Sequence, residues 1–243
     1  MWNRSYVLIA GLLLPCTFIA AQSQPDPIAI YRQAAARVTA ATAMSFHVEK
    51  RFDVVRIDGA KVEYSGALDV FANSTGGLFL DYGDDLSSRR AWYDGKEITL
   101  LDSIDNLYAM TPASGSNAEA LIQVSEEYGL EMPLASLLKR ELADNLEALG
   151  EAIYLGIHDA EGEACHHLLF RGESKDLQVW ISTGEQALLR KLVITFWDIE
   201  GAPQQALTFS EWNLDAEIAA DMFEAKIPED ALLIEFLLMG GGK

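Results

Sequence analysis

The chain has 243 residues, with 18 Lys and Arg against 37 Asp and Glu, a formal net charge of −19, and an apolar fraction of 50%. So large an apolar fraction excludes a disordered acidic chain, which combines high charge with low hydrophobicity. The acidic balance also disfavours nucleic acid as a partner and docking by charge onto anionic lipid, because both are negatively charged.

The first 23 residues have the order of a secretory signal peptide. Arg4 supplies a positive charge, residues 7–15 are apolar, and small residues follow, so cleavage is expected after Ala21 or Ser23. An uncleaved anchor is the alternative, although the apolar run is shorter than a membrane-spanning helix requires. Cys16 resembles a lipidation site, but the preceding residue is proline where a small residue is expected. The sequence predicts export to the periplasm.

The mature chain is expected to form one domain, residues 24–243. Removal of the signal peptide leaves 17 basic residues against 37 acidic ones, a net charge of −20. Cys165 is then the only cysteine, which excludes an internal disulfide and a zinc site built on several thiolates. No later segment reaches transmembrane length, so no stable membrane anchor is expected after signal removal.

The first half of this domain predicts one helix followed by antiparallel strands. Asp26 is a candidate N-cap with Pro27 at the first helical position, and the helix should run to residue 43. From Ser45 the apolar period changes to two, and the Asp-Gly pairs at 58–59 and 94–95 predict tight hairpin turns. Strands are expected at residues 46–54, 62–70, 78–82, 89–93, 97–101 and 107–110.

A helical insert then separates these strands from a second set. Asn117 is expected to cap a helix to Tyr128 that ends at Gly129, and Pro133 to open a second one over residues 134–146. Strands resume after Gly150, at residues 152–157, 166–171, 177–182, 188–197 and 206–214, and residues 233–236 are compatible with a last strand.

This layout predicts a mainly β fold of the α+β class. About eleven antiparallel strands would form one strongly curved sheet, an incomplete barrel, covered by the N-terminal helix and the central helical insert. If the helices fill the concave side incompletely, an apolar cavity remains; the alternative is that they fill it completely. The aromatic and apolar candidates for lining such a cavity or its lid are Phe46, Phe71, Trp92, Tyr108, Leu121, Val124, Tyr128, Leu134, Leu137, Leu138, Trp180, Phe196 and Trp212.

Cys165-His166-His167 is the cluster that most suggests metal or nucleophilic chemistry. Neighbouring strand residues point to opposite faces, so Cys165 and His167 share a face that His166 does not. Two ligands are too few for a zinc site, and His47 or His158 would have to join them. Burial within a strand is the simpler role, and neither catalytic residues, a metal nor a cofactor is expected.

Several stretches resemble the DUF2092 family of predicted periplasmic proteins and, more loosely, the lipoprotein-carrier superfamily. They include Asp26-Pro-Ile-Ala-Ile, Met44-Ser-Phe-His-Val, Trp92-Tyr-Asp-Gly-Lys-Glu-Ile-Thr-Leu-Leu, Tyr128-Gly-Leu-Glu-Met-Pro, Leu189-Arg-Lys-Leu-Val-Ile-Thr and Phe223-Glu-Ala-Lys-Ile-Pro-Glu-Asp-Ala. The resemblance covers essentially the whole mature chain. It implies a curved sheet with helices across its opening and, in the carriers, acyl chains held between the two.

Three functions are compatible with these features. The leading hypothesis is a periplasmic, non-enzymatic protein that shelters a lipid, an acyl chain or a lipoprotein segment in an apolar cavity between sheet and helices. The alternative is a regulatory or scaffold module of the cell envelope that binds a protein partner, which the acidic surface predicts to be basic. A hydrolase that uses His166 or His167 is the third.

Overall fold

A computed structural model describes residues 24–128 and 150–236. Helix α1 (Pro27–Ala40) begins as predicted, because the Asp26 carboxylate accepts a hydrogen bond from the Ile28 amide at 2.9 Å and Pro27 occupies the first turn. Among the described residues, no helix is long and apolar enough to cross a membrane.

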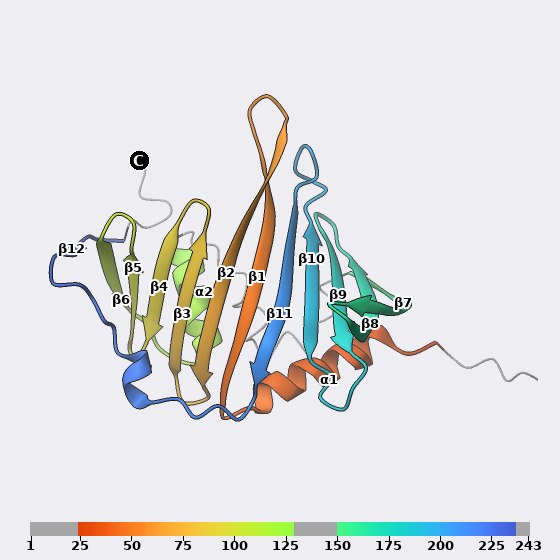
Figure 1. The fold of residues 1–243 in the computed structure, drawn as a ribbon, viewed down its shortest axis with the longest axis horizontal. Helices are drawn as coiled ribbons and strands as arrows, with labels where there is room; N and C mark the ends of the chain where they lie inside the picture. Colours follow the sequence, from red (N-terminus) through yellow and green to blue (C-terminus); the bar gives the residue numbers. More distant parts are fainter. Residues whose placement is uncertain (1–23, 129–149, 237–243) are drawn as a thin grey trace, which may run out of the picture.

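The strands form a single sheet in the order β12-β6-β5-β4-β3-β2-β1-β11-β10-β9-β8-β7 (Figure 1). All neighbours pair antiparallel except β12, which runs parallel to β6. The bounds are β1 Ala43–Val55, β2 Lys61–Asn73, β3 Gly77–Asp84, β4 Ser88–Tyr93, β5 Glu97–Asp102, β6 Leu107–Pro112, β7 Glu151–Ala160, β8 Glu163–Arg171, β9 Asp176–Ser182, β10 Leu189–Thr195, β11 Gln204–Asn213 and β12 Leu232–Leu233. The predicted fold class is confirmed, with twelve described strands in place of about eleven.

The two predicted Asp-Gly turns are present. Gly59 joins β1 to β2 with a φ of 82°, and Gly95 joins β4 to β5 with a φ of 89°, a region that favours glycine. Helix α2 (Asn117–Tyr128) differs from the prediction in its cap. Ser116, not Asn117, forms a capping box, in which its amide donates to the Glu119 carboxylate at 2.6 Å and its hydroxyl accepts from the Glu119 amide at 3.3 Å.

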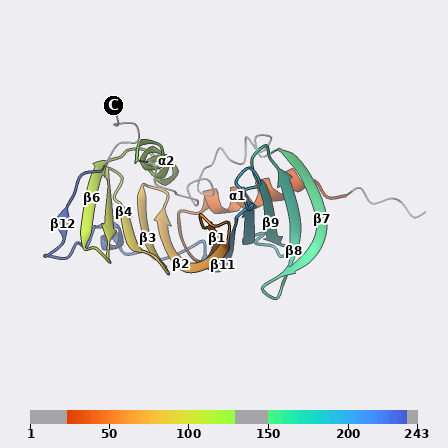
Figure 2. The same ribbon diagram turned by 90° about the horizontal axis from the view of Figure 1, so that it is seen from above.

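Both helices lie on the concave side of the sheet (Figure 2). Helix α1 packs against β7 and β9, and α2 lies over the half of the sheet that contains β3 and β4. Alternate strand residues on this side form the core together with Tyr31 of α1 and Leu121 and Val124 of α2. The buried strand residues of this core include Phe46, Val48, Val70, Ala72, Leu78, Leu80, Tyr93, Ile98, Leu168, Phe170, Val179, Ile181, Leu192, Leu207 and Phe209.

The convex side also carries buried apolar residues. The C-terminal segment runs past the strand ends to the short helix η3 (Ala220–Phe223), and Phe223 is buried against β3 (Figure 1). A Cβ atom on Gly77 would lie 2.6 Å from the Phe223 ring, so this approach requires glycine there. Both faces of the β3 region are therefore partly covered.

Candidate functional site

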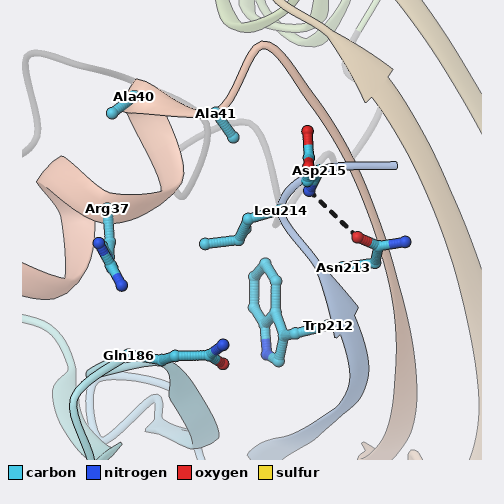
Figure 3. Close-up of a pocket in the computed structure, with 8 residues that line it drawn as sticks. All are labelled: Arg37, Ala40, Ala41, Gln186, Trp212, Asn213, Leu214 and Asp215. Atoms are coloured by element: carbon cyan, nitrogen blue, oxygen red, sulfur yellow. Dashed lines mark hydrogen bonds between the residues drawn. The ribbon is translucent and has the colours of Figure 1, made fainter. Parts of the chain in front are cut away.

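A pocket of about 390 Å³ opens where the end of α1 meets the end of β11; we call it the α1–β11 pocket (Figure 3). Helix α1 contributes its last turn, β11 and the residues after it form the opposite wall, and the β9–β10 connection closes one side. Its lining residues are Arg37, Ala40, Ala41, Gln186, Trp212, Asn213, Leu214 and Asp215.

A β-bulge directs Trp212 into this pocket. Strict alternation along β11 would place Trp212 on the convex face with Ser210, which pairs with His47 of β1. The register between β1 and β11 shifts by one residue between the pair His47–Ser210 and the pair Ser45–Asn213. Glu211 lies in this interval and takes a φ of 54°. The extra residue turns Trp212 to the concave side, opposite Phe46.

The Trp212 ring is fixed by three contacts. It stacks on Phe46 with ring centroids 4.3 Å apart and an interplanar angle of 24°, and it lies 6.1 Å from Phe209. Its indole N–H donates to the Leu189 carbonyl at 2.9 Å. Phe46 and Phe209 are buried while Trp212 is only half-buried, so the aromatic stack connects the core to the pocket.

Arg37 gives the pocket a positive charge at its rim. Its side chain is exposed, and among the described residues it forms neither a hydrogen bond nor an ion pair. An apolar floor beside this guanidinium suits an amphipathic ligand whose anionic group lies toward Arg37 and away from the Asp215 carboxylate, because guanidinium binds carboxylate and phosphate well. The volume lies at the lower end of the range of about 300–1,000 Å³ for small-molecule sites.

Comparison with known proteins assigns the chain to a family. The family described as "Predicted periplasmic protein (DUF2092)" matches residues 28–237. The chain belongs to this family. The resemblance inferred from the sequence is thereby confirmed, and the family description agrees with the predicted periplasmic location. No curated protein matches this DUF2092 chain.

A solved structure shares the fold of this DUF2092 protein at low sequence identity, and two others resemble it with lower TM-scores. An uncharacterized conserved protein from Thermus thermophilus has a TM-score of 0.50 at 11% identity, covering 85% of this chain and 97% of the other. The Mycobacterium tuberculosis lipoprotein LppX has a TM-score of 0.42 at 16% identity, and the match covers 81% of this chain and 100% of the other. A LolA superfamily protein from Nitrosomonas europaea has a TM-score of 0.37 at 10% identity, and the match covers 82% of this chain and 97% of the other.

Some of the candidate lining residues predicted from the sequence do lie on the concave side of the DUF2092 sheet. Phe46 stacks on Trp212, which lines the α1–β11 pocket. Leu121 and Val124 are fully packed against the core, and Tyr128 shares a hydrogen bond of 2.9 Å with Thr111 and stacks on Phe236. Leu134, Leu137 and Leu138 lie outside the described residues, as do Gly129 and the predicted helix at 134–146.

The predicted placement beneath the helices is wrong for four aromatic candidates, which face the convex side: Phe71, Trp92, Tyr108 and Trp180. Phe71, Phe79 and Trp92 form a row of adjacent rings there, 6.1 Å and 5.5 Å apart. The reason is that the convex face is also apolar in this region, so aromatic character does not distinguish the two faces. Phe196 lies past the end of β10, where its amide donates to the Pro203 carbonyl.

The Cys165-His166-His167 cluster is divided between the faces as the alternation predicts. His166 lies on the concave side, where Nδ1 is 3.1 Å from the Tyr154 hydroxyl. Cys165 is fully buried, and burial raises the pKa of its thiol to about 11, so it remains protonated at neutral pH. His167 contacts His158 on the neighbouring strand.

Sequence reasoning missed Arg37, Gln186 and Leu214 of the pocket. The two polar residues are exposed positions with no motif around them, and Leu214 follows the last residue of β11. The signal that pointed toward this site was the aromatic residue near the end of a predicted strand, Trp212.

Proposed function

We propose that this DUF2092 protein is a periplasmic, non-enzymatic binding protein that shelters an acyl chain, a lipid or a lipidated segment of a lipoprotein between sheet and helices. The observation that carries the proposal is Trp212, which lines the α1–β11 pocket and stacks on the buried Phe46. Entry of an acyl chain along this stack would place its anionic end near Arg37.

Apolar burial, not charge, would supply most of the affinity. Each buried methylene contributes about 0.8 kcal/mol, so about eight of them contribute about 6 kcal/mol. An ion pair at the exposed Arg37 contributes at most about 1 kcal/mol. The dissociation constant should therefore fall about fourfold for each added methylene until the pocket is filled.

A chain-length series tests this proposal. Saturated fatty acids of increasing length, kept below their micelle concentrations, are titrated into the mature protein by calorimetry. Trp212→Ala should weaken binding of the longer acids at least tenfold, since it removes the floor of the pocket. Arg37→Gln should weaken binding less than about fivefold, in line with a surface ion pair.

Two variants serve as matched controls. Trp197 is a half-exposed tryptophan in the β10–β11 connection, outside the residues that line the pocket, so Trp197→Ala should leave fatty-acid affinity unchanged. Arg56→Gln, at the β1–β2 turn and outside the pocket lining, is the matched control for Arg37→Gln and should likewise leave fatty-acid affinity unchanged. Equal losses in Trp197→Ala and Trp212→Ala, or affinity independent of chain length, would contradict the proposal.

A protein partner is the second candidate, and the apolar edge of the sheet favours it. Leu232, Leu233 and Ile234 are 65%, 61% and 46% exposed at β12, whose outer edge has no strand partner among the described residues. Such an edge can pair with an added strand from another chain. Replacing Leu233 with Lys should abolish capture of that partner and leave fatty-acid binding intact; unchanged capture would contradict this second candidate.

A further inference from the structure

A pair of histidines on the convex face stands apart from the α1–β11 pocket. His158 on β7 and His167 on β8 approach each other with their Nδ1 atoms 2.9 Å apart. They lie diagonally across the two strands, since the direct partner of His167 is Gly156 and that of His158 is Cys165. Gly156 lies at a bulge with a φ of 115° and has no side chain, so the His158 ring extends beside it.

The tautomer of His167 is fixed by its other nitrogen. Nε2 lies 3.2 Å from the Gln178 Oε1 atom, an acceptor, so Nε2 carries the proton and Nδ1 accepts a hydrogen bond from the His158 Nδ1–H group, whose proton a bound metal ion would displace. A neighbouring carbonyl that fixes the far nitrogen in this way is a common second partner of a metal-binding histidine.

The 2.9 Å separation of the two nitrogens is that of this hydrogen bond, and a metal ion that replaces the shared proton without moving the rings needs a particular geometry. Two imidazole nitrogens that lie 2.9 Å from each other, and that each lie about 2.05 Å from a metal ion, subtend an angle of about 90° at the metal. A tetrahedral zinc centre would hold them about 3.3 Å apart. Square-planar or tetragonal coordination by nitrogen and oxygen is typical of Cu(II) and Ni(II), and Cu(II) binds most tightly in the divalent series.

We propose that His158 and His167 form a two-imidazole site for Cu(II), with Ni(II) as a weaker ligand of the same site and water completing the coordination. Among the described residues, no third His, Cys, Asp or Glu side chain joins this pair as a metal ligand. Cys165 supplies no ligand, because its side chain is fully buried. The strongly acidic chain raises the local cation concentration, which favours occupancy.

Trp180 makes the site directly observable. Its ring stacks on His167 at a centroid separation of 3.9 Å and an interplanar angle of 16°. The Lys191 Nζ atom, on the next strand, lies 5.4 Å from the centroid of the Trp180 ring. Bound Cu(II) should quench Trp180 fluorescence, and the readout depends on no activity of the protein. Trp180→Phe should remove most of the quenching while it retains metal binding.

The test uses the mature chain without a histidine tag, titrated with Cu(II) and separately with Ni(II). We expect one Cu(II) per chain, reversal of quenching by a chelator, and a tetragonal electron paramagnetic resonance spectrum with coupling to two nitrogens. His158→Ala should reduce Cu(II) affinity at least tenfold, and this substitution removes an exposed side chain. Gln178→Met, which removes the acceptor from His167, should reduce it about tenfold.

The two remaining histidines provide controls in the same chain. His47, on β1, contacts Asp69, and His166 faces the concave side, so His47→Ala and His166→Ala should bind Cu(II) with unchanged affinity. Equal losses in all three histidine variants, unchanged affinity in His158→Ala, or a spectrum with a single coupled nitrogen would overturn the proposal. Fatty-acid binding should be unaffected by His158→Ala, which separates this site from the proposed function.

Discussion

Replacing Trp212 with phenylalanine removes one hydrogen bond and keeps an aromatic ring beside Phe46. The Leu189 carbonyl, which accepts from the indole at 2.9 Å, then loses its partner. Loss of such a bond costs about 1–2 kcal/mol when the remaining group is shielded from water. The free energy of unfolding of Trp212→Phe should fall by about that amount, since the half-buried indole contributes little further burial.

Urea denaturation followed by far-UV circular dichroism at pH 7 measures this change. With an m-value of about 3 kcal/mol per M, a loss of about 1.5 kcal/mol lowers the midpoint by about 0.5 M. Trp197→Phe, at an exposed position, should leave the midpoint within about 0.2 M of the wild type. An unchanged midpoint in Trp212→Phe would refute the role of the indole N–H in fixing the ring.

A double-mutant cycle separates the stack from the hydrogen bond. Phe46→Leu, Trp212→Leu and the combined variant should give a coupling energy of about 0.5–1.5 kcal/mol, as for other aromatic pairs. Additive effects of the two substitutions would mean that the rings do not stabilise each other, and the floor of the pocket would then lack a fixed geometry.

Three further predictions concern separate parts of the fold. Ser116→Ala should lower the free energy of unfolding by about 1 kcal/mol through loss of the α2 capping box, and an unchanged urea midpoint would contradict the assigned cap. The Cys165 thiol, with a pKa raised to about 11 by burial, should not react with a disulfide reagent at pH 8 until urea unfolds the protein; immediate reaction of native protein would refute this. Burial, with smaller effects of His158 and Lys191, lowers the pKa of His167 below the unfolded value of 6.5, so its stabilising effect is present above pH 6.5 and is lost as the pH falls below that value. His167→Gln should therefore flatten the decline in stability between pH 7 and pH 5, and parallel profiles would contradict the shift.

Local sequence patterns predicted the elements well because each rests on near-neighbour chemistry. The Asp26-Pro27 start, the two Asp-Gly turns and the period of two from Ser45 depend on residues a few positions apart. The cap of α2 was misassigned because Ser116 and Asn117 are both good cap residues. The choice between them depends on Glu119, three residues after Ser116.

The site was less predictable because it depends on long-range pairing. Alternation indicates which residues share a face, but not which face the helices cover, and Trp92 is buried on the convex side. Trp212 reaches the pocket only through a bulge at Glu211, which reverses the expected alternation. His158 and His167 likewise meet because a register shift precedes Gly156. In both sites, one extra residue in a strand therefore determines which side chains come together.

Native mass spectrometry of protein purified from its own periplasm tests most directly whether the α1–β11 pocket carries an amphipathic ligand. We expect a bound mass that solvent extraction releases as an acyl-containing molecule, and that is reduced in Trp212→Ala but not in Trp197→Ala. Protein that is empty after purification and that binds neither fluorescent fatty acids nor lipopeptides would contradict this central claim.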